Sequence, residues 1–428
     1  MEDNKNLNSE EIEQMSATPV TQEADVYKET GVESIGSSVD SSVGLDETAV
    51  TADEPLEVTV EATAEITAET TAEPSVSAHS VADGTTAPGY AYFSSLDEER
   101  REKLRRKREI RRLSNATAIP LIGFDIVGFV VALILQIFLI VLLGQDRTEE
   151  LLRDPDFNYL FSGFFSIIYL LFPFLLINKM TGIKLKSTVA FGRCRFSKAI
   201  SAIMLGFGVI AVSQYASSYF SLVLENILGR PVVNPAPEYG TGVVSWIINL
   251  VCVGLIPAVM EEFAFRGVIL GTTRKFTSDG LSILINATLF SMFHGNIHQI
   301  PFTFALGLYL SYITVYTGSV VPAMVVHGVN NSLAVVLSML TDSASGLAQT
   351  VISVSYYVIL LLVGILGLII FINSDKDPLR LSKERSEDAK TVAGDYFSSA
   401  GFIIFAIMTF ISVLDVQYGL TSKIIEKM

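Results

Sequence analysis

Ionisable and carboxamide side chains occur in three short motifs inside otherwise apolar segments. The motifs are EEFAFRG at residues 261–267, FSMFH at residues 290–294 and HGVNN at residues 327–331. An ionisable side chain at mid-bilayer costs about 2.5 to 3.5 kcal/mol even on mild insertion scales, so such residues usually face the interior of a helix bundle and serve a function. The clustering of three such motifs predicts a functional site.

Helical spacing assigns different roles to the two adjacent glutamates. Glu262 and Arg266 are four residues apart and share one helix face, so they can neutralise each other as an ion pair. Glu261 points about 100° away around the helix axis and has no such partner. We therefore expect Glu261 to project into a cavity, where a buried carboxylate can act as a general base.

Two further motif positions can supply groups that polarise a substrate. His327 and Asn331 are four residues apart, so their imidazole and carboxamide lie on the same helix face. Donors arranged in this way can stabilise a developing oxyanion. His294 adds a second imidazole, and we expect helix packing to bring it close to Glu261 and His327.

The elements that must position these motifs are apolar segments long enough to cross a bilayer, which takes about 20 residues. Nine candidates predict an all-α, polytopic transmembrane bundle of about eight to nine spans. They lie near residues 116–144, 159–178, 199–224, 242–270, 281–297, 299–317, 319–340, 350–373 and 397–414.

The charged connections predict how these spans are oriented. Residues 179–198 contain six Lys and Arg and no acid, and nine Lys and Arg lie between Arg100 and Arg112. Basic loops favour the cytoplasmic side, so we expect a multi-pass protein of the cell membrane with a cytoplasmic N-terminus. The lipid bilayer is then its first partner, and residues 96–115 form a basic juxtamembrane helix.

The acidic residues are concentrated at the N-terminal end. Residues 1–99 contain 23 Asp and Glu against two Lys and Arg, a net charge of −21, whereas the remainder carries +6. The Glu/Thr/Ala-rich composition predicts a disordered acidic tail over residues 1–95, because it offers too little apolar surface to bury. The charge pattern gives no support for nucleic-acid binding, and Cys194 and Cys252 do not suggest a disulfide framework.

The three motifs, in their order EExxFRG, FxxxH and HxxxN, resemble the CPBP family. This family of CAAX proteases and bacteriocin-processing enzymes, also called Abi, is related to the Ras-converting CAAX endopeptidase. The resemblance covers a core of about residues 240–340 within a transmembrane domain at 116–428. It implies an intramembrane endopeptidase that hydrolyses a peptide bond of membrane-associated peptides or proteins, in CAAX-type or bacteriocin- and immunity-related processing.

The resemblance also implies a glutamic mechanism without a cofactor or metal. By the family pattern, Glu261 would be the general base on a water that His294 positions, while His327 and Asn331 would stabilise the oxyanion. The supporting residues Glu262 and Arg266 match motif positions that hold the helix and orient Glu261.

Two other classes of function remain open at this stage. Glu261, His294, His298 and His327 are acceptable zinc ligands, which would make a metalloprotease, although no HExxH motif occurs. Polar residues at membrane depth also mark transport pathways, but no repeat of two related halves is visible. A non-catalytic immunity protein on the same scaffold is a further alternative.

Overall fold

The computed structural model describes residues 88–235, 238–240, 242–374, 381 and 388–419, except for the side chains of residues 88–95, 169 and 171–173. The first 87 residues of the predicted acidic tail therefore lie outside the described residues. Within the described part, every regular element is a helix, apart from an isolated bridge between Phe191 and Ser319. The predicted all-α class is confirmed.

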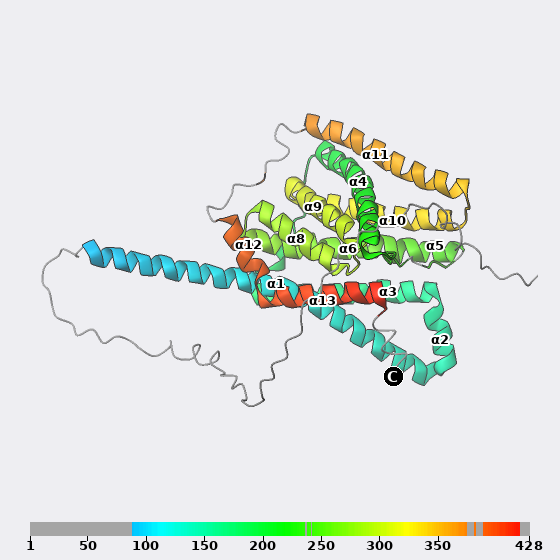
Figure 1. Ribbon diagram of the computed structural model, residues 1–428, viewed down its shortest axis with the longest axis horizontal. Helices are drawn as coiled ribbons and strands as arrows, with labels where there is room; N and C mark the ends of the chain where they lie inside the picture. Colours follow the sequence, from blue (N-terminus) through cyan, green and yellow to red (C-terminus); the bar gives the residue numbers. More distant parts are fainter. Residues whose placement is uncertain (1–87, 236–237, 241, 375–380, 382–387, 420–428) are drawn as a thin grey trace, which may run out of the picture. The chain divides into compact units, whose positions relative to one another are not determined.

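Figure 1 shows the order and arrangement of the helices. In chain order they are α1 (Pro88–Leu143), α2 (Gln145–Arg153), α3 (Pro155–Thr181), the 3₁₀ turn η1 (Leu185–Ser187), α4 (Phe196–Leu228), α5 (Val243–Asn249), the π-helical η2 (Leu250–Leu255), α6 (Ile256–Glu262), the π-helical η3 (Phe263–Ile269), α7 (Leu270–Phe276), α8 (Asp279–Phe293), α9 (Ile300–Thr317), α10 (Val321–Asp342), α11 (Leu347–Ser374), α12 (Ala389–Phe397) and α13 (Ala400–Tyr418).

Each of the nine predicted apolar segments lies largely in helix. Seven helical stretches in the described residues are long and apolar enough to cross a membrane: α1, α4, the run Val243–Phe276, α9, α10, α11 and α13. The other two predicted segments correspond to α3, with 27 residues, and α8, with 15. At 1.5 Å per residue, α8 is only about 22 Å long, which is shorter than the roughly 30 Å hydrocarbon core.

The predicted segment 281–297 was too long at its C-terminal end. Helix α8 ends at Phe293, and Gly295 adopts a φ of +57° that favours glycine. The N-terminus of α8 is capped by Ser278, whose hydroxyl accepts a hydrogen bond from Leu281 N. Pro301 then starts α9 in the first helical turn. His294 consequently lies at the end of α8 and not inside a spanning helix.

The fourth predicted span is a single helical run interrupted by two π-helical segments. The segments η2 and η3 lie on either side of α6, which carries Glu261 and Glu262 at its C-terminal end. A π-turn adds a residue to the helical repeat and rotates the side chains that follow it, and such turns are frequent at functional sites. The spacing of side chains here is therefore not that of a continuous α-helix.

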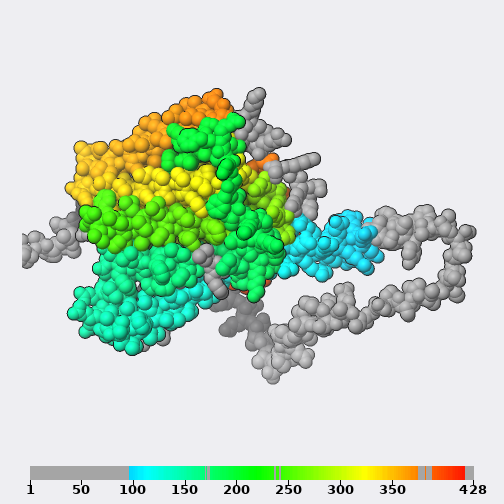
Figure 2. Space-filling view, turned by 180° about the vertical axis from the view of Figure 1, so that it is seen from behind, coloured from blue at the N-terminus to red at the C-terminus, as the bar shows by residue number. Residues whose placement is uncertain are grey.

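The described helices bury two separate hydrophobic clusters. One is formed by residues of α1, α3, η3, α8, α12 and α13 around Phe174, Phe265 and Phe290. The other is formed by α4, α9, α10 and α11 around Tyr309, Leu310 and Val326. Figure 2 shows α10 and α11 running side by side on one face of the bundle. The three motifs lie where these helix groups meet.

Helix α1 continues through the predicted junction between the basic helix and the first span. Ile110, Leu113 and Leu121 are buried in the bundle, so the basic segment is part of the packed structure. The Arg112 guanidinium donates to Met180 O at the end of α3, with Nη2 at 2.8 Å, and Arg106 donates to Phe276 O at the end of α7. Cationic groups at helix C-termini are favourable because they complement the exposed carbonyl groups.

Candidate active site

The predicted ion pair on the first motif is present and completely buried. Arg266 Nη1 donates to Glu262 Oε1 at 2.7 Å, and both side chains are 0% exposed. The second guanidinium nitrogen, Nη2, donates to Gly307 O in α9 at 3.4 Å. This arrangement ties α6 and η3 to α9, and its charge balance makes the burial tolerable.

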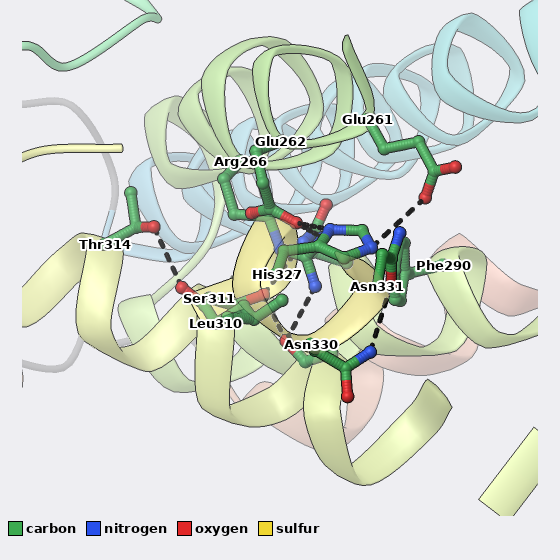
Figure 3. Close-up of polar contacts among 12 residues, drawn as sticks. Glu261, Glu262, Arg266, Phe290, Leu310, Ser311, Thr314, His327, Asn330 and Asn331 are labelled. Carbon is green, nitrogen blue, oxygen red and sulfur yellow. Dashed lines mark hydrogen bonds and ion pairs between the residues drawn. The ribbon is translucent and has the colours of Figure 1, made fainter. Parts of the chain in front are cut away.

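The same carboxylate oxygen also binds an imidazole from the third motif. His327 Nδ1 lies 2.8 Å from Glu262 Oε1. An ionised carboxylate can only accept, so Nδ1 carries the hydrogen and donates it. Nε2 then faces the other glutamate, with 3.9 Å between it and Glu261 Oε2. Figure 3 shows His327 lying between Glu262 with Arg266 on one side and Glu261 on the other.

A cavity of about 280 Å³ lies beside the three motifs, and Glu261 is the only one of the two glutamates that lines it. Its side chain is 15% exposed, whereas that of Glu262 is fully buried. Glu261 Oε2 is itself buried and has no hydrogen-bond partner among the described residues. The sequence analysis predicted this division of the pair, and Figure 3 shows the two side chains pointing in different directions, as expected for adjacent helical positions.

His294 is fixed at the C-terminal end of α8. Its Nδ1 lies 2.8 Å from Phe290 O, and because a carbonyl oxygen only accepts, Nδ1 is the donor. Nε2 of the neutral imidazole is therefore an acceptor. Since His294 and Glu261 line the same cavity, Nε2 can accept a hydrogen bond from a water that Glu261 also holds.

The carboxamides of the third motif lie next to each other on α10. Asn330 Nδ2 donates to Asn331 Oδ1 at 3.0 Å. With its oxygen engaged in this way, Asn331 has its amide hydrogens left to donate, and both residues line the cavity. His327 and Asn331, which the sequence analysis paired, line the same cavity. The hydrogen-bond partner of His327 is Glu262.

A single aromatic ring supports three of the ionisable side chains. The Arg266 guanidinium lies 4.1 Å from the centroid of the Phe290 ring, a cation–π contact. The same ring packs at right angles to His327, with 5.8 Å between centroids, and at 71° to His294, with 4.7 Å. The sequence analysis included Phe290 in a motif without assigning it this role.

All four predicted catalytic residues line one cavity of about 280 Å³. The structure therefore brings Glu261, His294, His327 and Asn331 together from α6, α8 and α10. The cavity also contains neutral polar side chains that the sequence analysis did not single out as site residues. Asn330 belongs to the third motif, and the others come from segments without a motif: Gln214, Ser217, Asn234, Tyr239, Gln299 and Thr303.

Two of the possible zinc ligands use a ring nitrogen in a contact within the protein. In the part of the chain that the structure describes, no group of three or more His, Cys, Asp and Glu side chains is placed to hold a metal ion. His298 lines the cavity, but its Nδ1 lies 2.7 Å from Ser221 Oγ in α4. His327 Nδ1 is taken by Glu262.

Comparison with known proteins agrees with this geometry. Residues 243–333 match the family described as type II CAAX prenyl endopeptidase Rce1-like, and this segment contains all three motifs. The part of the chain that carries the three motifs is therefore similar to the CAAX protease family. The boundaries of the matched CAAX protease domain are close to the core of residues 240–340 that the motifs predicted.

A curated relative extends the similarity beyond the motifs. The chain is similar to the membrane-embedded CAAX protease MroQ of Staphylococcus aureus (strain USA300), with 25% identity over 148 residues. The aligned region is 33% of this chain and 59% of MroQ, so the chain spans less than two thirds of that relative's length. No solved structure matches the chain.

Proposed function

We propose that the protein is an intramembrane endopeptidase that hydrolyses a peptide bond of membrane-associated peptides or proteins, with a water activated by Glu261. The observation that carries the proposal is the buried Oε2 of Glu261, which has no hydrogen-bond partner among the described residues and lies in a cavity shared with His294, His327 and Asn331. A carboxylate in this position is available to take a proton, and the CAAX protease domain around it supports a proteolytic reaction.

In the proposed first step, a water lies between Glu261 and His294. The Glu261 carboxylate accepts one proton of the water, and the remaining O–H donates a hydrogen bond to Nε2 of His294. The water oxygen then bonds to the carbonyl carbon of the substrate. The amide hydrogens of Asn331 then donate to the oxyanion that forms. Glu261 finally returns its proton to the leaving amine, so the base of the first step is the acid of the second.

The Glu262–Arg266 pair has a positioning role in this proposal. Glu262 Oε1 holds Nδ1 of His327, which turns Nε2 towards the cavity. When Nε2 also carries a proton, the imidazolium can donate to the oxyanion, and the Glu262 carboxylate balances the positive charge. Arg266 in turn balances Glu262.

We also propose the orientation that the basic loops predict. The N-terminus and residues 179–198 would be cytoplasmic, and residues 1–90 would be dispensable for catalysis. Cys194 is a native probe for this, because the structure has it as a free thiol. Labelling of Cys194 in intact cells by a membrane-impermeant thiol reagent would contradict the orientation.

The experiment that tests the proposed function compares Glu261→Gln with Glu262→Gln and the wild type. Each protein is purified, reconstituted in liposomes and incubated with a library of quenched fluorescent transmembrane peptides. Glu261→Gln should reduce cleavage by about 10²- to 10⁴-fold, the range for loss of a general base, with the thermal unfolding midpoint unchanged. Glu262→Gln should instead lower the amount of folded protein, because Arg266 loses its partner.

Two controls complete this experiment. Glu150→Gln removes a carboxylate that is exposed on α2 and should leave cleavage at the wild-type rate. Exhaustive chelation separates the zinc alternative, since a glutamic mechanism keeps its activity after chelation. Cleavage by Glu261→Gln at the wild-type rate would reject the mechanism. If neither the wild type nor any variant cleaved a peptide of the library, a transport or immunity function would be favoured.

A further inference from the structure

The part of the cavity that the proposed chemistry does not use combines apolar side chains with polar side chains that carry no charge. Carboxamides from four different segments line it: Gln214, Asn234, Gln299 and Asn330. Among the lining side chains that the structure describes there is no Lys or Arg. The cavity therefore offers donors and acceptors of the kind found in a peptide bond, and its formal negative charge comes from Glu261.

One of these carboxamides has an acceptor without a partner. Gln214 Oε1, on α4, is buried and has no hydrogen-bond partner among the described residues. A buried acceptor that stays unpaired is costly, about 1 to 3 kcal/mol. The Gln214 side chain also hydrogen-bonds with Tyr357 of α11, and its position in the cavity lining leaves Oε1 as an acceptor near a group that enters the cavity.

Helix α4 is held firmly against the connection between α8 and α9. Ser217 Oγ donates to His298 O, and Ser221 Oγ lies 2.7 Å from His298 Nδ1. Asn296 Oδ1 accepts from His298 N at 2.9 Å. Burial lowers the pKa of His298, so this imidazole is neutral at pH 7 and adds no positive charge to the cavity.

The chemistry of this lining distinguishes between two kinds of peptide. A free C-terminal carboxylate close to the scissile bond would enter a cavity that already holds the Glu261 carboxylate, without a cation to offset the loss of hydration. An uncharged stretch of extended backbone instead exposes N–H and C=O groups that lose their water on entry and require partners. Carboxamides satisfy both kinds of group.

We propose that the cavity recognises an uncharged, extended stretch of peptide backbone, with Gln214 Oε1 accepting a backbone N–H, and that cleavage does not require a free C-terminal carboxylate next to the scissile bond. The inference rests on the proposed endopeptidase function and names its substrate class. A volume of about 280 Å³ suits a short stretch of peptide and not a folded segment.

The first test uses one peptide, selected from the quenched fluorescent transmembrane library by its Glu261-dependent cleavage. Two versions are synthesised, in which the scissile bond lies three residues from the end and the C-terminus is either a free acid or a carboxamide. We expect kcat/KM for the two versions to agree within about twofold. A preference of tenfold or more for the free acid would overturn the inference.

The second test examines Gln214 with the same peptide. Each backbone nitrogen near the scissile bond is methylated in turn, which removes one donor at a time. At one position we expect methylation to raise the KM of the wild type about fivefold to tenfold, the value of one hydrogen bond, with kcat nearly unchanged. For Gln214→Met, which keeps the side-chain length, KM for the unmodified peptide should be raised by the same factor. Methylation at that position should not raise it further.

Gln145→Leu, a change on α2 outside the cavity, is the matched control and should retain the full methylation effect. Independent, multiplicative effects of Gln214→Met and methylation at every position would overturn the assignment of Gln214. The failures are distinguishable: absence of any Glu261-dependent cleavage would reject the proposed function and this inference together, whereas cleavage that depends on the free acid would reject the inference alone.

Discussion

Two contacts between helices hold the bundle together by opposite means. On one side, α4 meets α11 where Gly208 and Gly364 bring the two backbones into direct contact. In the second contact, Glu262, Arg266 and His327 join α6, η3, α9 and α10 through buried charges. The glycine contact contains no ionisable group at these positions, and the charged contact depends on every member being paired.

The difference determines what each region tolerates. A glycine contact between membrane helices is stabilised by close packing and is sensitive to any added volume. A buried charge network is sensitive to the loss of a single member, because the remaining charge stays buried without compensation. We therefore expect volume changes to separate α4 from α11 without altering the chemistry, and charge changes near the cavity to affect stability and chemistry together.

Arg266→Met should have the largest effect on stability. Removal of the guanidinium leaves the Glu262 carboxylate buried with only His327 as a partner, which should cost about 3 to 5 kcal/mol of unfolding free energy. Denaturation in detergent micelles measures this. The double variant Glu262→Gln/Arg266→Met should recover most of the folded protein, because it removes both charges. Equal instability of the single and double variants would contradict this assignment.

Gly364→Val should have the next largest effect on stability. A Cβ at position 364 would overlap the backbone of Gly208, which cannot move away as a flexible side chain could. Overpacking of this kind typically costs about 1 to 3 kcal/mol. The kcat of the molecules that remain folded should stay close to the wild-type value. The matched control is Gly123→Val in α1, where a Cβ meets no atom within 4 Å.

Phe290→Leu tests the aromatic support of the charged region. Leucine keeps the site apolar but removes the cation–π contact with Arg266 and the ring contacts with His294 and His327. We expect a loss of about 1 to 2 kcal/mol in stability and a fall in kcat, because the two imidazoles lose a neighbour that orients them. A stability loss with unchanged kcat would show that Phe290 only fills space.

Ser221→Ala should have the smallest effect of the four. The hydroxyl holds His298 Nδ1, and its removal should cost about 0.5 to 1.5 kcal/mol. The expected signature is a severalfold rise in KM with kcat retained, since His298 lies in the cavity lining but outside the proposed chemistry. A change in kcat of the same size as the change in KM would place His298 in the reaction itself.

Local periodicity was sufficient to predict several features. The nine apolar segments correspond to helices, and the spacing of Glu262 and Arg266 predicted their ion pair. The interpretation that Glu261 is the exposed member of the pair is supported by its position in the cavity lining. These features depend on residues within one or two helical turns, where the geometry follows from the sequence alone.

The remaining features depend on contacts between distant segments. His327 and Glu262 are 65 residues apart, and their hydrogen bond exists only because α10 packs against α6. The two π-helical segments carry no residue signature that distinguishes them from ordinary helix. Gln214 belongs to no motif, and its importance arises from the folding of α4 against the site. Pairing over such distances is not encoded in local spacing.

The arginines of α1 have a consequence for biosynthesis. Arg112 finds its carbonyl partner 68 residues later in the chain, and Arg106 finds its partner 170 residues later. At translation rates of about 5 to 20 residues per second, Arg106 waits roughly 10 to 30 s before Phe276 has been made. Before that, Glu109, three residues away on α1, is available to Arg106 as a partner. The contact between Arg106 and the end of α7 therefore forms only after α7 has been made.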